Sequence, residues 1–302
     1  MGFKEILEFV KIEHTLFSLP FVLIGYFLAE NQFGAQTFDI FWIIIAAIGA
    51  RGLAMTLNRI IDREIDAVNP RTNNRHLVSG TMSIRTAWNL SAFFLGILLF
   101  GAWQLNEVAL LMSWLPVLAF VIYPYTKRYT WFCHFWLGLC LALAPAGAWL
   151  AVAADTLGWD AITGINGDQH WFPEIFFISM GVATWIAVFD MNYARMDVES
   201  DRENSIHSIP SRFGDGITTR VSVLLTLIWA FCFALAFDFE TSSDSSLLSF
   251  SLGTMSVLNI SVILARERLA DFQATLFRVS MLTGWALLAT IMMVDAPSDV
   301  MQ

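Results

Sequence analysis

Nine apolar segments of roughly membrane-spanning length restrict the fold of this 302-residue chain more than any other feature. A transmembrane helix needs about 20 predominantly apolar residues. The segments lie at 15–29, 38–57, 84–103, 108–123, 131–153, 173–189, 217–239, 247–264 and 272–294. Hydrophobic residues make up 57% of the chain and charged residues only 14%, which is rare in a soluble domain of this length. The sequence therefore predicts an all-α integral membrane protein built as a bundle of nine transmembrane helices.

The basic residues predict how this bundle is oriented, because Lys and Arg accumulate on the cytoplasmic side of membrane proteins. With a cytoplasmic N-terminus, every Lys and Arg except Arg51 lies in or beside a cytoplasmic segment. The outer segments, which contain no Lys or Arg, are 30–39, 104–107, 154–171, 238–246 and 295–302. We expect an external C-terminus and a cytoplasmic cap of loops and short helices. No long linker divides the chain, so residues 1–302 are expected to form one domain.

Two acidic motifs stand where two of these segments reach the cytoplasmic side. Asn58, Asp62 and Asp66 form an N-x-x-x-D-x-x-x-D pattern after the second segment, and Asp197 and Asp201 repeat the spacing of four after the sixth. Residues four apart share one face of a helix, so each pair of carboxylates is expected to point the same way. Ionisable groups beside the bilayer are costly and usually functional. The pattern favours divalent cations that bridge to a polyphosphate.

The residue types suit Mg²⁺, which is commonly held by one or two carboxylates together with substrate phosphates. The predicted metal ligands are Asp62, Asp66, Asp197 and Asp201. Basic side chains in the adjoining cytoplasmic segments offer charge-assisted contacts to a diphosphate. These candidates are Arg71, Arg75, Lys127, Arg128 and Arg212.

A structural alternative stays open for the same aspartates. Acidic residues beside helix ends are often solvated or paired with nearby arginines. The arginines available within the two motifs are Arg59, Arg63, Arg195 and Arg202. The doubled occurrence of the acidic pattern on one side of the membrane favours the metal interpretation over this alternative.

Further motifs accompany the acidic ones. They are Asn69-Pro70-Arg71-Thr72-x-x-Arg75, Tyr123-Pro124-Tyr125-Thr126-Lys127-Arg128, Asp190-x-x-Tyr193-Ala194-x-x-Asp197-x-x-x-Asp201 and His207-Ser208-Ile209-Pro210. In their order, from His14 to Gly214, these residues resemble the UbiA superfamily of intramembrane prenyltransferases, most closely the branch that acts on 4-hydroxybenzoate and related quinone precursors. Two positions depart from the common pattern: Arg59 stands where members commonly have Asp, and His76 stands where they have Pro.

The resemblance implies electrophilic aromatic prenylation in ubiquinone or related quinone biosynthesis. An allylic polyprenyl diphosphate loses its Mg²⁺-bound diphosphate, and the ring of a hydroxylated aromatic acid attacks the resulting cation. Asp62, Asp66, Asp197 and Asp201 are then catalytic as well as metal-binding, together with Asp190. Substrate binding is expected at Asn58, Arg71, Arg75, Lys127, Arg128, Tyr193 and Arg212. The expected surroundings are membrane lipid, in the inner membrane of a bacterium, with no nucleic-acid partner.

Arg51 is the residue that points to the acceptor. It lies seven positions before Asn58, two helical turns deeper on the same face, where an unpaired guanidinium in the membrane is expensive. In the resembling family the Arg at this position lies near the aromatic acid, so the resemblance implies that the acceptor carboxylate is its partner. A carbonyl or acid of another helix is the structural alternative. The most similar branch suggests 4-hydroxybenzoate. The Asn58-Arg59 pair is also common in relatives on a menaquinone route, so a dihydroxynaphthoate acceptor stays open.

Two further classes of function stay open at this stage. Helical bundles with intramembrane charges include ion-coupled transporters, for which Asp190 and Arg51 are natural candidates. Transporters place such charges near the bilayer midplane, whereas the acidic motifs here lie at the mouth of the bundle. Other acceptors of the resembling superfamily, such as a haem, a chlorophyllide or a glyceryl ether, are ranked lower by the detailed motifs alone.

Overall fold

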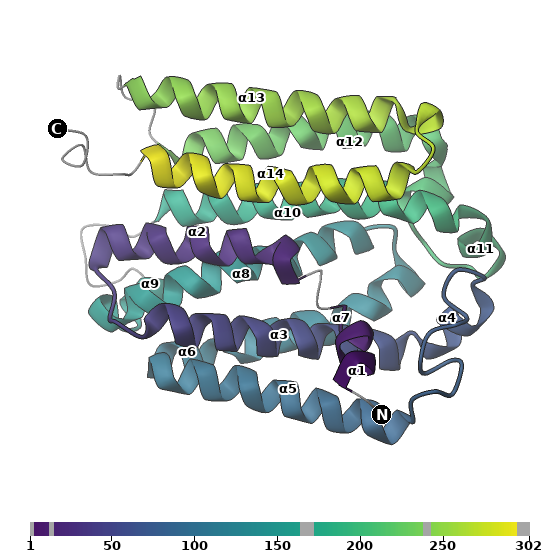
Figure 1. Cartoon of the computed structure of the whole chain (residues 1–302), viewed down its shortest axis with the longest axis horizontal. Helices are drawn as coiled ribbons and strands as arrows, with labels where there is room; N and C mark the ends of the chain where they lie inside the picture. Colours follow the sequence, from purple (N-terminus) through teal and green to yellow (C-terminus); the bar gives the residue numbers. More distant parts are fainter. Residues whose placement is uncertain (1–2, 12–14, 164–171, 238–242, 295–302) are drawn as a thin grey trace.

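The computed structural model describes residues 3–11, 15–163, 172–237 and 243–294. Long helices run side by side and form the bundle (Figure 1). They are α2 Thr15–Phe33, α3 Asp39–Ile61, α5 Ile84–Leu105, α7 Trp114–Tyr129, α8 Cys133–Leu157, α10 Pro173–Tyr193, α12 Ile209–Ala236, α13 Ser243–Leu264 and α14 Phe272–Val294. Shorter elements are α1 Phe3–Phe9, α4 Arg63–Val68, α6 Glu107–Met112, α9 Asp160–Thr163, η2 Ala194–Asp197, α11 Val198–Glu203 and η3 Arg266–Arg268.

The prediction of nine membrane helices is confirmed. Within the described ranges, nine helices are long and apolar enough to cross a bilayer, α6 and α7 together forming one and α10 with η2 and α11 another. The protein is an integral membrane protein. His14, residues 164–171 and 238–242, which were expected on the outer side, and residues 295–302 lie outside the described residues.

One helix begins earlier than the apolar pattern predicts. We expected a span from residue 217, but α12 begins at Ile209. The side chain of Ser208 accepts a hydrogen bond from the Ser211 backbone N–H, and the Ser208 backbone N–H donates one to the Ser211 hydroxyl, forming a capping box. At Gly214 the backbone takes φ 79°, a left-handed conformation that favours glycine, and kinks the helix. The apolar pattern begins only after this kink, so it missed the first turn.

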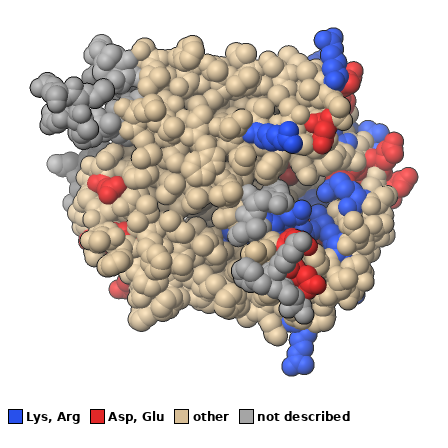
Figure 2. Space-filling view, viewed as in Figure 1, with Lys and Arg blue, Asp and Glu red and all other residues tan. Residues whose placement is uncertain are grey.

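Charged residues separate along the bundle in the way that the sequence predicts. α4 and α11 lie at the same end of the molecule (Figure 1). On the face shown in Figure 2, Lys and Arg gather at that end, mixed with acidic residues, whereas the opposite end shows acidic residues without basic ones. Hydrophobic side chains cover the surface between the two ends, including Phe93, Phe231 and Phe250, which are exposed. An apolar belt of this kind suits a lipid environment.

Small residues bring two of the central helices into direct backbone contact. A Cβ atom added at Gly138 of α8 would lie 2.2 Å from the carbonyl oxygen of Ala183 on α10. In a membrane, where lipid is as apolar as a side chain, such close approach supplies much of the packing energy between helices. Gly147, nine residues further along the same helix, has no atom within 4 Å of the corresponding position.

We therefore predict opposite effects of the same substitution at these two glycines. Gly138→Ala should destabilise the protein by about 1–3 kcal/mol through overpacking, because the atoms that the new methyl group meets belong to the backbone of Ala183. Gly147→Ala should be neutral or stabilising by up to about 1 kcal/mol, because alanine favours helix and meets no neighbour. Unfolding of the purified proteins in detergent measures both. Equal destabilisation of the two variants would contradict the close contact of α8 and α10.

Candidate active site

The aspartates of the two acidic motifs meet at the end of the bundle where α4 and α11 lie. Asp62 terminates α3, Asp66 lies in α4, Asp197 ends η2 and Asp201 lies in α11. The chain that carries each motif is not one regular helix, since α3 stops at Ile61 and a 3₁₀ turn precedes α11. The carbonyl of Ile61 accepts a hydrogen bond of 2.6 Å from the Arg128 guanidinium, which draws this end of the helix toward α7.

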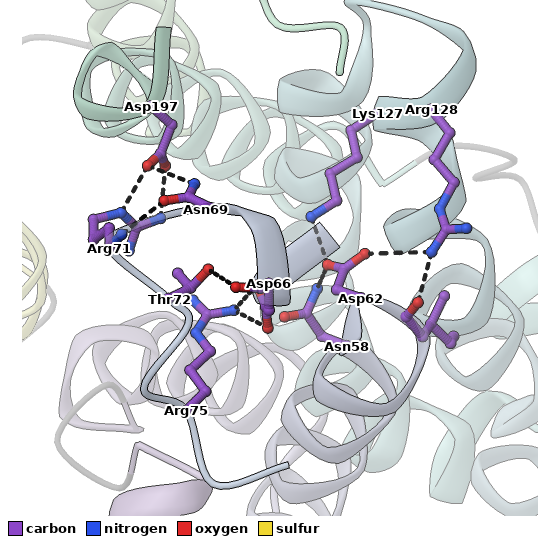
Figure 3. Close-up of polar contacts among 11 residues, drawn as sticks. Asn58, Asp62, Asp66, Asn69, Arg71, Thr72, Arg75, Lys127, Arg128 and Asp197 are labelled. Atoms are coloured by element: carbon purple, nitrogen blue, oxygen red, sulfur yellow. Dashed lines mark hydrogen bonds and ion pairs between the residues drawn. The ribbon is translucent and has the colours of Figure 1, made fainter. Parts of the chain in front are cut away.

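Asp62 is the most deeply buried of these carboxylates, with 1% of its surface exposed. Its Oδ2 accepts hydrogen bonds from Lys127 Nζ at 2.5 Å and from Asn58 Nδ2 at 2.9 Å (Figure 3). Its Oδ1 has no hydrogen-bond partner and lies 4.0 Å from Arg128 Nη2. Burial raises the pKa of Asp62, and the Lys127 ammonium opposes that shift.

Asp66 and Asp197 are each held by an arginine from the loop after α4. Arg75 Nη1 donates to both oxygens of Asp66 at 2.6 Å. Arg71 donates to Asp197 through Nε at 2.9 Å and Nη2 at 2.6 Å, and Asn69 adds a bond of 3.0 Å (Figure 3). The forked Arg71–Asp197 pair joins the first acidic motif to the second, although the two residues are 126 positions apart.

Asp201 is held differently, by the start of α12. Its Oδ2 accepts a hydrogen bond of 2.9 Å from the hydroxyl of Ser208, the residue that also caps that helix. No Lys or Arg forms an ion pair with Asp201 among the described residues. The four aspartates therefore form one cluster with unequal surroundings, in which three carboxylates face cations and one faces a hydroxyl.

The arginines within the motifs do not neutralise this cluster. Arg195 pairs with Asp215, and Arg202 donates to the carbonyl of Ser211 at 2.9 Å. Arg59 is buried, and its Nε and Nη1 have no hydrogen-bond partner. In the described ion pairs, neither these residues nor Arg63 contact the four aspartates. Asp66 and Asp197 do pair with arginines, as the structural alternative expects, but the described partners are Arg75 and Arg71 and not the arginines within the motifs.

A cavity of about 430 Å³ lies inside the bundle beside this cluster. Most of its wall is apolar and comes from α2, α3, α5, α6, α7, α8 and α10. Its polar lining consists chiefly of Arg51, Asn58, Tyr123, Asp190 and Tyr193. Asn58 belongs to both regions, because it lines the cavity and donates to Asp62.

The remaining predicted site residues take different positions. Tyr193 lines the cavity, and the guanidinium carbon of Arg71 lies 5.9 Å from its ring centroid. Arg128 caps α3 and lies over the ring of Tyr125 at 5.4 Å. Arg212 is exposed and lies over Phe213 at 5.7 Å, so the structure does not bring it into the cluster.

Arg51 lies on the same wall of the cavity as Asn58, as their spacing predicts. Its Nε is buried without a hydrogen-bond partner. Such an atom inside an apolar bundle costs free energy, which an anionic ligand in the cavity would recover.

Sequence analysis gave no role to three polar residues that the structure places at the site. Asn69 binds Asp197, Tyr123 lines the cavity, and His134 forms a hydrogen bond of 2.7 Å with Asp190. Asn69 and Tyr123 belong to motifs beside the acidic ones, which was a usable signal. His134 lies in the apolar segment 131–153, where nothing in the pattern distinguishes it from a packing residue.

The donor set suits a metal ion only if a ligand completes it. No group of three or more His, Cys, Asp or Glu side chains is arranged to hold a metal in the described part of the chain. The unpartnered Oδ1 of Asp62 is nevertheless a hard oxygen donor of the kind that Mg²⁺ prefers. The residues therefore fit a magnesium ion bound through one or two carboxylates, with phosphate oxygens and water as the other ligands.

Comparisons with known proteins agree with the motifs and the fold. Residues 18–292 match the model of the UbiA prenyltransferase family. The mitochondrial 4-hydroxybenzoate polyprenyltransferase of Schizosaccharomyces pombe is 29% identical over 170 residues, which are 55% of this chain but only 43% of that protein. The 4-hydroxybenzoate octaprenyltransferase of Alcanivorax borkumensis is 29% identical over 250 residues, 80% of each chain.

Solved structures share the whole architecture. The apo structure of a UbiA homolog from Aeropyrum pernix superposes with a TM-score of 0.80 at 27% identity, covering 93% of this chain and 98% of that one. A UbiA homolog from Archaeoglobus fulgidus, solved with GPP and Mg²⁺, has a TM-score of 0.65 at 18% identity over 95% of this chain and 99% of its own. At that identity the second comparison supports the fold alone.

The buried ion pair at Asp62 generates a stability prediction. Lys127→Met removes the cation and leaves the carboxylate buried, so it should lower the unfolding free energy by about 3 kcal/mol. Adding Asp62→Asn should restore most of that loss, because no charge is then left unpaired. Reversible unfolding in mixed micelles gives both values. If the double variant is no more stable than Lys127→Met, the ion pair does not govern the stability of this end.

Proposed function

Because the chain belongs to the UbiA prenyltransferase family, we propose that it transfers a polyprenyl group from a polyprenyl diphosphate to the ring of a hydroxylated aromatic acid. The acceptor we favour is 4-hydroxybenzoate, the substrate named for the curated relatives, in ubiquinone or related quinone biosynthesis. One observation carries the proposal. A cluster of aspartates paired with basic side chains is linked through Asn58 to an apolar cavity, and that cavity is lined by Arg51, whose buried Nε has no hydrogen-bond partner.

The cluster is the proposed site of the diphosphate. Asp62, Asp66, Asp197 and Asp201 would hold Mg²⁺, which when bound neutralises the leaving diphosphate as its charge develops. Arg71, Arg75 and Lys127 already lie against three of these carboxylates at 2.5–2.6 Å. With Mg²⁺ held by the carboxylates, the same basic side chains would be close enough to contact the phosphate oxygens. Arg128 and Arg212 belong to this proposal less directly, since their side chains cap α3 and lie on Phe213.

The cavity is the proposed site of the prenyl chain and the ring. Phe17, Phe120 and Phe189 contribute aromatic walls, and aromatic faces stabilise cations. Such walls also keep water away from an allylic cation, which would otherwise be hydrolysed. Arg51 offers the acceptor carboxylate a guanidinium with an unused N–H. Tyr123, Asp190 and Tyr193 supply the other polar contacts for a phenol.

The reaction then balances with the residues of this chain. The bond between the allylic carbon and the diphosphate oxygen breaks, and the electron pair leaves with the diphosphate. The ring carbon ortho to the hydroxyl forms a new bond to the allylic carbon. The proton lost from that ring carbon passes to the Asp190 carboxylate, and the ring regains its aromaticity. Positioning of the two reactants supplies much of the rate enhancement.

We propose further that the end with the cluster faces the cytoplasm, in the inner membrane of a bacterium. The gathering of Lys and Arg at that end supports the orientation (Figure 2). Radiolabelled prenyl transfer in membranes, compared with ion or substrate flux in sealed vesicles, distinguishes this function from transport.

Metal removal tests the proposed role of the cluster. Excess chelator should abolish prenyl transfer by the purified protein and Mg²⁺ should restore it, because the carboxylates are proposed to reach the diphosphate only through metal. Ala replacements of Asp62, Asp66, Asp197 or Asp201 should each lower turnover by at least about 100-fold, with insertion into membranes unchanged. Full activity in chelator, or mild effects at all four positions, would place the donor site elsewhere.

Donor and acceptor recognition should separate by residue. Arg71→Ala and Arg75→Ala should weaken polyprenyl diphosphate binding and leave the preference among acceptors unchanged. Arg51→Ala should do the reverse, because it removes one partner of a desolvated charge pair. Such a loss costs about 2–5 kcal/mol, which means at least about tenfold weaker acceptor binding.

The assay for these variants uses a panel of 4-hydroxybenzoate and dihydroxynaphthoates, with mass spectrometry of the products. Unaltered acceptor affinity in a folded Arg51 variant would make this arginine structural. Prenylation of a dihydroxynaphthoate in place of 4-hydroxybenzoate would move the protein to the menaquinone alternative.

A further inference from the structure

A histidine and an aspartate outside the metal cluster lie together beside the cavity. His134 belongs to the first turn of α8 and Asp190 to the last turn of α10, two helices that pack directly on each other. The ring of His134 is 1% exposed, whereas Asp190 lines the cavity. His134 Nδ1 and Asp190 Oδ2 are 2.7 Å apart. The histidine therefore reaches a reactant only through the aspartate.

A second contact fixes the protonation of the imidazole. The backbone N–H of Ile209, the first residue of α12, donates to His134 Nε2 at 3.1 Å. This N–H is one of the groups at a helix start that have no partner within the helix. Since Nε2 accepts a hydrogen bond, it carries no proton. The proton of a neutral imidazole is then on Nδ1, and it is donated to the Asp190 carboxylate.

We infer that His134 is a positioning residue, which orients the Asp190 carboxylate as the base for the acceptor and does not itself carry the transferred proton. This inference rests on the proposed function. Asp190 Oδ2 accepts the hydrogen bond from His134, so Oδ1 is the oxygen that takes up the proton released from the acceptor's aromatic ring. The imidazole cannot pass that proton onward, because Nε2 faces an N–H donor and not an acceptor.

The start of α12 therefore contacts both the metal cluster and the histidine beside the cavity. Ser208, the residue before Ile209, donates to Asp201 in the metal cluster, and Ile209 donates to the histidine that orients Asp190. Two consecutive residues thus fix a carboxylate of the donor site and, through His134, one of the acceptor site. A histidine that served packing alone would need neither contact.

Paired substitutions test the inference kinetically. His134→Phe keeps an aromatic ring but loses both hydrogen bonds, and it should lower kcat by about 10- to 100-fold, as loss of an orienting partner does at metal sites. The KM for polyprenyl diphosphate should not change. His134→Gln, whose amide can both donate and accept, should stay within about threefold of the native kcat. Asp190→Asn should lose at least about 100-fold, and adding His134→Phe to it should lower kcat no further.

Two kinetic outcomes would contradict the inference. A large loss in a folded His134→Gln variant would mean that the imidazole transfers protons. Independent, multiplicative losses from His134→Phe and Asp190→Asn would mean that His134 does not act through the aspartate. All variants are compared on whichever aromatic acid the native protein prenylates. If it prenylates none, the proposed function fails. The measurement described next still decides which nitrogen of His134 carries the proton that is donated to Asp190.

That measurement is ¹⁵N NMR of the full-length protein with labelled histidines in detergent. Of five histidines, the one whose signals disappear in His134→Gln is His134. Its spectrum at neutral pH should show a protonated Nδ1 and an unprotonated Nε2, and Asp190→Asn should shift the Nδ1 signal. A proton on Nε2 would overturn the inference, whatever the activity of the protein.

Discussion

The burial of carboxylates at one end of an apolar bundle is the constraint on which the rest of this structure depends. An isolated charge in such surroundings costs several kcal/mol, and Asp62 is almost fully buried. Its cation comes from the end of α7, whereas the cations of Asp66 and Asp197 come from the loop after α4. Because the partners come from separate segments, neutralising the aspartates also closes the cap of the bundle. Stability and the ability to bind a polyanion therefore rest on the same contacts.

The bundle itself could be predicted from the sequence, because each membrane helix is specified by its own composition. The lengths of the apolar segments were enough to predict nine helices that are able to cross a membrane in the described part of the chain. The error at the start of α12 came from a capping box and a glycine kink, which are local contacts that hydropathy does not record.

The partners of the site residues could not be predicted, since they depend on how distant segments fold together. Arg71 reaches Asp197 across 126 positions, while Arg59, which lies within the first acidic motif, makes none of the described ion pairs with its aspartates. Arg212 carries the expected charge, but its guanidinium lies over the ring of Phe213. His134 was invisible in an apolar segment because its function lies in two hydrogen bonds, to Asp190 and to the start of α12.

The kink at Gly214 separates the first turn of α12 from the part of that helix that crosses the membrane. Ser208 and Ile209, which hold Asp201 and His134, lie on one side of the kink, and the long apolar part of the helix lies on the other. Bilayers of different thickness change the tilt of membrane helices. Because the kink lies between these two parts, a change of tilt in the long apolar part would not have to move the groups that hold the carboxylates. The geometry of the site would then depend little on the thickness of the surrounding bilayer.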